Sequence, residues 1–169
     1  GLYHNPAIAE RMDTLAGMLA DHKVKKVYGY LKKPIKAQVN AIVDELAKEN
    51  VPLAVGPTFG HASKFELQNK TWETPGVLAK AGCHVSIITD APVIPLHYLP
   101  LCAGLAMKAG MDEYDALRAI TINPAEHIGV ADRVGSLEEG KDADIVIMDG
   151  TPFTVEGVVK HVFIDGEEI

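Results

Sequence analysis

The sequence contains few of the residues that build disulfide frameworks or zinc knuckles. Its 169 residues include only two cysteines, Cys83 and Cys102, and their spacing matches neither arrangement. Both lie in apolar surroundings, so we interpret each as a small buried hydrophobic residue rather than a reactive thiol. A reducing, cytoplasmic compartment is therefore expected.

Long apolar runs and an excess of positive charge are also missing. No run approaches the ~20 residues that a membrane-spanning helix needs. Residues 1–13 have neither a basic region nor an apolar core, so we expect no signal peptide there, and the initial Gly1 leads us to expect a processed or excised piece. The formal net charge of −7 argues against nonspecific nucleic-acid binding, which needs a basic surface.

The middle of the chain contains alternating helix and strand patterns. The composition, 47% hydrophobic and 23% charged, is that of a globular domain with a core. Apolar residues at helical spacing predict a helix over residues 37–50, ending with Asn50 in the left-handed conformation. Two short apolar runs, residues 51–55 and 83–89, are typical of strands that are buried on both faces of a parallel sheet.

A further helix is expected between these two strands, with its cap at Thr74 and its end at Lys80. The loops after the strands are longer than the turns after the helices, as in parallel α/β folds, where the loops after the strands carry the site. The loop over residues 56–70 has a length that is usually functional or disordered. Two alternatives therefore stay open for this loop as a whole, contact with a substrate and exposure to solvent alone.

Three more helices are predicted before the sequence changes character. The first covers residues 97–108, and the second is capped by Asp112 and covers residues 113–121. In the third, Asn123 is expected to cap a helix that ends at Gly129. These patterns complete an α/β body.

A small β module follows. Residues 143–148 are expected to form a strand that is apolar apart from Asp144 rather than alternating, so both of its faces are expected to need cover. Residues 158–169 alternate and then turn at Asp165-Gly166, which indicates a hairpin. We therefore expect strands that pair with something outside this module, either residues 1–36 or a second copy of the chain.

Taken together, these motifs resemble a known family. Residues 116–150, which contain ITINPAEHIG and GSLEEGKDADIVIMDG, and residues 159–169 resemble the C-terminal signature of the amidohydrolase superfamily. Residues 51–95 look like the last two barrel strands of that family with their connecting helix. The branches that the chain resembles most are the imidazolonepropionase-like and Xaa-Pro-dipeptidase-like amidohydrolases.

The resemblance implies an α/β fold, namely a partial (β/α) TIM-type barrel with a C-terminal piece of the amidohydrolase β-sandwich. Residues 37–128 would be the C-terminal part of the barrel and residues 129–169 the sandwich segment, whereas residues 1–36 remain unassigned. A partial barrel leaves sheet edges unpaired, and such edges pair readily with another copy. We therefore expect a homo-oligomer.

The chemistry that the resemblance implies is hydrolysis of amide-type C–N bonds by a water that a divalent metal, zinc in our expectation, activates. The family places an Asp at the end of the last barrel strand, and Asp90 matches that position directly after residues 83–89. Asp90 is thus our candidate for both catalytic base and metal ligand. The alternative is an Asp that only caps the turn formed with Ala91 and Pro92.

The other metal ligands of the family are missing. No His-x-His pair occurs, and no histidine stands near Ile35, where the resemblance places the ligand of the sixth strand. Since a catalytic zinc needs about three protein ligands, this chain alone is expected to be inactive and to hold little or no metal. The fragment would then belong to an enzyme acting on small amide or dipeptide-like substrates. The alternative is a non-catalytic assembly domain derived from such an enzyme.

The remaining histidines are weaker candidates. His61 lies after the penultimate strand, where it would bind substrate or simply be solvated. His97 would line a pocket or pack at the start of a helix. Structural roles are expected for His84, His127 and His161. We expect neither nucleic-acid nor membrane partners.

Overall fold

The computed structural model describes residues 35–56 and 71–169, with side chains from residue 42 onward. All of these residues belong to one compact unit, residues 35–169. The helices are α3 (Ile35–Lys48), α4 (Thr74–Lys80), the 3₁₀ turn η3 (Leu96–Tyr98), α5 (Leu99–Lys108), α6 (Glu113–Arg118) and α7 (Ile122–Ile128). The strands are β1 (Leu53–Val55), β2 (Val85–Ile87), β3 (Ile145–Asp149), β4 (Val158–Ile164) and β5 (Glu167–Glu168).

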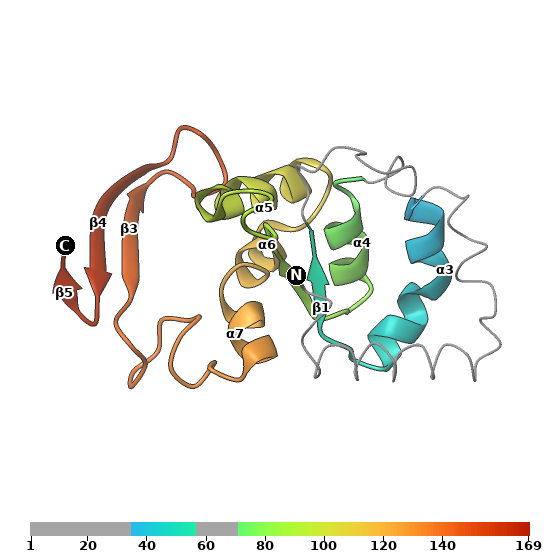
Figure 1. Ribbon diagram of the computed structural model, residues 1–169, viewed down its shortest axis with the longest axis horizontal. Coiled ribbons are helices and arrows are strands. Elements are labelled where there is room, and N and C mark those ends of the chain that lie inside the picture. The colour runs from blue at the N-terminus through green and yellow to red at the C-terminus, as the bar shows by residue number, and fades with distance from the viewer. Residues whose placement is uncertain (1–34, 57–70) are drawn as a thin grey trace. The chain divides into compact units, whose positions relative to one another are not determined.

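The first half of the described chain is a β-α-β unit preceded by a helix (Figure 1). Strands β1 and β2 are parallel and in register from Leu53 opposite Val85 to Val55 opposite Ile87. Helix α3 runs into a left-handed Asn50 with φ 48°, as the sequence predicts. Parallel pairing places the carboxyl ends of both strands at one edge, which is where an α/β fold carries its site.

The two strands differ in burial. All three residues of β2 are buried, with Val85 and Ile87 at 1% and 3% exposure, which confirms the prediction for this strand. The corresponding prediction for residues 51–55 is wrong, because Ala54 in the middle of β1 is exposed. The α/β fold is confirmed, but among the described residues the parallel sheet has only two strands.

Helices α4 and α5 cover β2, and small side chains permit this close packing. Cys102, Ala103 and Ala106 of α5 are fully buried, in one cluster that reaches Ile87 of β2. The same cluster includes Phe153, from the loop between β3 and β4. This cluster therefore joins the β-α-β unit to the loop of the β module, while Leu78, Cys83 and Val85 form a second cluster.

Two helix caps differ from their predictions. Thr74 is the first residue of α4 rather than its cap, and Glu73 takes the cap position without a side-chain hydrogen bond. Asn123 lies inside α7, where its side chain turns toward β2. The cap at Asp112 is confirmed, since its carboxylate accepts hydrogen bonds from the backbone of Tyr114 and Asp115. Polar residues next to a helix start do not by themselves reveal which of them bonds to the backbone.

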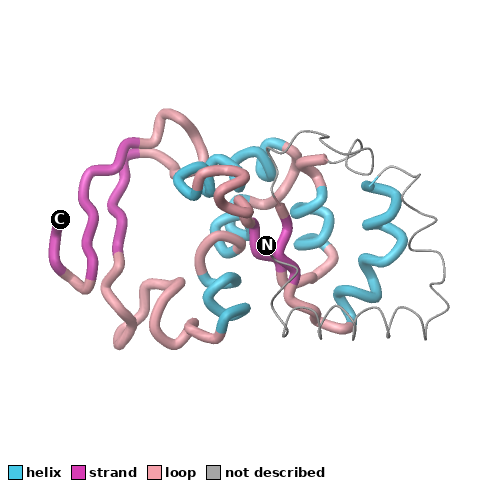
Figure 2. Tube along the Cα trace, viewed as in Figure 1, coloured by secondary structure: helices cyan, strands magenta, loops and turns pink. Residues whose placement is uncertain are grey.

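The C-terminal module is a three-stranded antiparallel sheet in the order β3-β4-β5 (Figure 2). The predicted hairpin is confirmed: Asp165 and Gly166 join β4 to β5 with φ of 51° and 82°. Apolar residues of β3 remain exposed, with Val146 and Ile147 at 56% and 46%. The expected cover for this strand is therefore not supplied by the described residues.

Both cysteines are buried, as predicted. Burial raises the pKa of the Cys83 thiol, which keeps it protonated and unreactive. Within the described ranges, no helix has the length and apolar character to cross a membrane.

Candidate active site

Asp90 follows β2 where the chain turns away from the sheet. Thr89 before it is buried, with 3% exposure, whereas Asp90 itself is half-buried. The backbone of Asp90 is left-handed, with φ 52°. Its carbonyl accepts a hydrogen bond from the backbone N–H of Val93 at 2.9 Å, and the Ala91–Pro92 peptide bond is cis. The position predicted for Asp90, at the carboxyl end of a buried strand, is thus confirmed, while its catalytic role stays a prediction.

The left-handed backbone of Asp90 supports a functional role for this position. A non-glycine residue there costs about 1 kcal/mol or more, although Asp tolerates the conformation better than most residues. Backbone strain of this kind collects at functional sites. The turn thus fixes a carboxylate at the edge where α/β proteins bind their ligands.

Strand β1 ends at the same edge. The backbone N–H of Ile88 donates to the carbonyl of Val55 at 3.0 Å, so the two strand ends stay together beyond the sheet. A Cβ at Gly56 would lie 2.1 Å from the carbonyl oxygen of Ile88, so only glycine fits this approach. The loop that leaves Gly56 therefore starts beside the turn that carries Asp90. His61 and the rest of residues 57–70 lie outside the described residues.

The described residues do not form a metal site by themselves. Among them, no group of three or more His, Cys, Asp and Glu side chains could hold an ion. Asp90 offers suitable oxygen donors, but a catalytic zinc needs about three protein ligands. The donor set in this part of the chain is therefore incomplete.

His97 takes neither of its two expected roles in the described structure. It lies in the 3₁₀ turn η3 and is exposed, and its ring centroid is 4.2 Å from that of Tyr98. It is therefore not packed into a helix start. No cavity that is described includes it, so we assign it no function.

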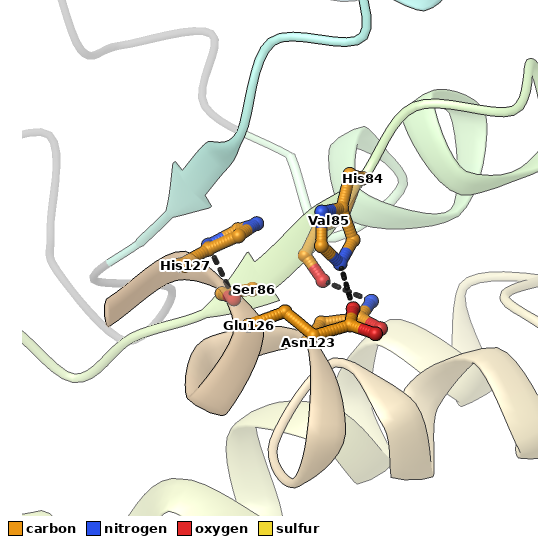
Figure 3. Close-up of polar contacts among 6 residues, drawn as sticks. All are labelled: His84, Val85, Ser86, Asn123, Glu126 and His127. Carbon is orange, nitrogen blue, oxygen red and sulfur yellow. Dashed lines mark hydrogen bonds and ion pairs between the residues drawn. The ribbon is translucent and has the colours of Figure 1, made fainter. Parts of the chain in front are cut away.

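A second polar cluster, which the sequence analysis did not single out, lies at the opposite end of β2 (Figure 3). Nε2 of His84 lies 2.7 Å from Oε2 of Glu126, and Oγ of Ser86 lies 2.8 Å from Nδ1 of His127. The rings of His84 and His127 meet edge to face, with centroids 4.4 Å apart. The side-chain amide of Asn123 donates to the carbonyl of Val85 at 2.7 Å. These contacts connect α7 to β2, which agrees with the structural roles that are expected for His84 and His127.

Residues 123–127 (NPAEH) carry three side chains of this cluster, but the sequence alone indicates only the start of a helix there. Helix α7 makes one turn over Asn123, Glu126 and His127, so these side chains project toward the same strand. A cavity of about 610 Å³ lies beside them, at the amino-terminal end of the strands. Its polar lining consists of Asn50, His84, Asp115, Arg118, Asn123 and Glu126. Catalysis in α/β barrels takes place at the other end, where Asp90 lies.

The environment lowers the pKa of His127. Burial is the main cause, because it disfavours the charged ring, and the neighbouring His84 acts in the same direction. The backbone of His84 and the carboxylate of Glu126 oppose this shift more weakly. His127 is thus held in its neutral form near neutral pH.

Comparison with known proteins places this geometry in a family. The sequence model of the Amidohydrolase family matches residues 15–169. An imidazolonepropionase from Thermoplasma volcanium is 42% identical over 92 residues, which are 48% of this chain and 23% of that protein. An adenine deaminase from Methanosphaera stadtmanae is 44% identical over 73 residues, or 43% of this chain and 12% of that enzyme.

Solved structures agree with the sequence matches. The crystal structure of an amidohydrolase from Thermotoga maritima superposes with a TM-score of 0.73 and 42% identity, over 78% of this chain and 34% of that one. An adenosine deaminase from Xanthomonas campestris with bound zinc gives a TM-score of 0.54 and 25% identity, over 76% of this chain and 34% of that one. The chain thus spans about a third of these structures and less of the two enzymes above.

Proposed function

The chain belongs to the amidohydrolase family, and we propose that it is the C-terminal part of a metal-dependent hydrolase of amide-type C–N bonds. Its match to about a third of the Thermotoga maritima amidohydrolase supports this. A complete (β/α)₈ barrel has eight strands and roughly 250 residues. In this proposal β1, α4 and β2 are a piece of such a barrel, within residues 37–128, and residues 129–169 are a piece of a β-sandwich.

The position of Asp90 is the observation that carries the proposal. Asp90 stands at the carboxyl end of a buried parallel strand, half-buried and fixed by a tight turn. A carboxylate there can accept a proton from an attacking water and pass it to the leaving nitrogen. Burial of Thr89 and β2 holds this carboxylate in place while leaving it accessible.

In the complete protein, we propose that Asp90 would hold a divalent metal, zinc in our expectation, through one carboxylate oxygen, together with ligands from outside the described residues. Such a metal would supply the polarisation of a water and of the scissile carbonyl. The zinc in the adenosine deaminase structure supports this choice of metal. The small number of cysteines, with both of them buried, supports a cytoplasmic location.

For the substrate, we propose a small molecule with an amide-type C–N bond, including dipeptide-like molecules. The relatives named imidazolonepropionase and adenine deaminase support a small substrate. His61 would contribute to its binding from the loop that begins beside the Asp90 turn.

The exposed sheet of the β module favours a second candidate, a non-catalytic assembly domain. Val146 and Val158 are each more than half exposed, and Ile147 and Val159 are about half exposed. Surface of this kind marks an interface with another chain or segment. The incomplete metal donor set also fits this alternative.

A chimera separates the two candidates. The matching third of the Thermotoga maritima amidohydrolase is replaced by residues 35–169 of this chain, and turnover is measured on acyl-amino-acid and cyclic-amide substrates with added zinc. We expect turnover within about tenfold of the parent, and a loss of about 100-fold or more in Asp90→Asn. Asp112→Asn is the matched control. It preserves a helix cap that lies away from the strand ends, and it should retain turnover. A folded chimera without turnover would favour the assembly domain, and a fully active Asp90→Asn would refute the role of Asp90.

A further inference from the structure

Helix α7 and Ala119, which precedes it in the sequence, contact β2 at three successive residues, Val85, Ser86 and Ile87. The three contacts are Asn123 Nδ2 to Val85 O at 2.7 Å, Ser86 Oγ to His127 Nδ1 at 2.8 Å, and Ile87 N to Ala119 O at 2.8 Å. The three contacts involve backbone and side-chain groups of β2 that do not form hydrogen bonds with β1. Two of the three partners are uncharged at every pH of interest, whereas His127 is not. The attachment of α7 to β2 therefore contains one titratable contact.

The contacts of His127 accommodate its neutral ring better than its charged ring. Nδ1 is bonded to Ser86, whereas Nε2 is buried and makes no hydrogen bond of normal geometry to the described residues. The backbone of His84 raises the pKa of His127, but by less than burial lowers it. A protonated ring carries an N–H on both nitrogens. Protonation would therefore place a charged N–H in a buried position without a well-formed hydrogen bond, which costs more than an unpaired neutral group.

The neighbouring charges do not remove this penalty. Glu126 supplies one negative charge, which can balance one imidazolium but not two, and its carboxylate faces His84 at 2.7 Å. The ring of His84 meets that of His127 at 4.4 Å, so two charged rings would repel each other. Asp115 and Arg118 of α6 line the adjoining cavity and carry opposite charges. The Cys83 thiol, next to His84, stays neutral because burial raises its pKa.

We propose that His84, Ser86, Glu126 and His127 form an acid-sensitive clamp, which holds α7 on β2 while His127 is neutral and loosens when His127 is protonated. The clamp does not depend on the proposed enzymatic activity. It acts at the amino-terminal end of the strand whose other end carries Asp90.

The lowered pKa of His127 gives the direction of the pH effect. In the unfolded chain, histidine titrates near its ordinary pKa of about 6.5. Between that value and the lower pKa of the folded state, the unfolded or opened state binds more protons. The clamp is therefore at full strength above about pH 6.5 and weakens as the pH falls below that value.

The backbone amide of Ile87 reports the state of the clamp, because it donates to Ala119 across the contact. Hydrogen exchange at this amide is measured by NMR on the 169-residue chain at pH 7.5 and 5.5, with correction for the intrinsic exchange rates. We expect protection at Ile87 to fall by about threefold or more at the lower pH, because the opened state takes up the proton more readily than the closed state. In His127→Gln, which cannot take up a proton, the fall should be less than about twofold.

The matched control is His161→Gln, which removes an exposed histidine that pairs with Glu168 in the β module. This variant should lose protection at Ile87 as the unsubstituted chain does. Constant protection in the unsubstituted chain, or an equal loss in His127→Gln, would overturn the proposal. If His127→Gln does not fold, ring titration of the unsubstituted chain decides, because a His127 midpoint at or above about 6.5 contradicts the clamp.

Discussion

The side-chain amide of Asn123 donates a 2.7 Å hydrogen bond to the backbone carbonyl of Val85, joining α7 to β2 across 38 residues of sequence. Asn123 is only 7% exposed and Val85 only 1%, so water cannot readily replace this bond. A buried carbonyl that loses its donor costs about 1–3 kcal/mol. The bond therefore contributes a substantial part of the stability of a domain of this size.

We expect Asn123→Asp to lower the free energy of unfolding by at least about 1–3 kcal/mol, because it removes the donor and places a carboxylate, ionised at neutral pH, against the Val85 carbonyl in a buried site. Urea denaturation followed by circular dichroism measures the change. Asp112→Asn serves as the control, since it exchanges the same two residue types at an exposed cap, and it should change stability by less than about 0.5 kcal/mol. Equal stabilities for the two variants would show that the buried bond contributes little.

A second prediction concerns Gly104, in the middle of α5. A Cβ at this position would lie 2.2 Å from the carbonyl oxygen of Phe153, which anchors the loop between β3 and β4 in the core. Alanine would normally stabilise a helix interior by about 1 kcal/mol relative to glycine. Here we expect Gly104→Ala to destabilise the fold by about 1–3 kcal/mol, because backbone must move to relieve the clash.

Gly140→Ala is a suitable comparison for Gly104→Ala. A Cβ at Gly140 has no atom within 4 Å, although its φ of 91° disfavours alanine. Its cost should thus be about 1 kcal/mol and entirely conformational. A crystal structure of Gly104→Ala should show the segment around Phe153 displaced. Unchanged stability with an undisplaced segment would contradict the close contact.

Much of the fold was predictable from sequence because local chemistry determines it. The left-handed Asn50, the cap at Asp112 and the hairpin at Asp165 each depend on residues within a few positions of one another. The same holds for the buried strand that precedes Asp90, since a short run rich in apolar and β-branched residues is enough to indicate it. The family resemblance, which the comparisons confirm, added what local patterns cannot provide.

The predictions that were wrong or absent concern contacts between segments that are distant in the sequence. Asn123 has the sequence environment of a helix cap, but its partner is Val85, and no local pattern indicates that bond. The cluster of His84 and His127 went unrecognised for the same reason, because 43 residues separate two rings that meet only in the fold. Ala54 is exposed although its neighbours are apolar, since burial depends on which elements cover a strand.

The third prediction concerns metal. We expect the purified 169-residue chain to contain well below one zinc per chain, because the described residues supply Asp90 without companion ligands. Elemental analysis of undialysed protein measures the content directly, and Asp90→Asn is the control that should show the same low value. Near-stoichiometric zinc that disappears in Asp90→Asn would show that residues outside the described ranges complete a site in this chain.

The last prediction concerns the exposed apolar residues of β3 and β4. The register places Val146 opposite Val162 and, beyond the Ile147–His161 pair and a bulge, Met148 opposite Val159. Because side chains alternate between the two faces of a sheet, exposed Val146 and Ile147 lie on opposite faces, and both faces carry uncovered apolar surface. Burying about 200 Å² of such surface contributes about 5 kcal/mol.

Association at micromolar concentration needs about 8 kcal/mol of net binding free energy, so these residues would form the apolar centre of a larger interface of about 1,200 Å² or more. We expect the 169-residue chain to form dimers or larger oligomers through such an interface. Light scattering coupled to size-exclusion chromatography measures the mass. Val146→Thr with Ile147→Thr, which keeps the β-branched shape and reduces the apolar surface, should shift the chain toward monomer. Lys160→Thr, on the same strand pair, is the control and should leave the mass unchanged. A monomeric unsubstituted chain with Val146 and Ile147 accessible to solvent would refute the prediction, whereas a monomer in which residues 1–36 cover them would refute only the association.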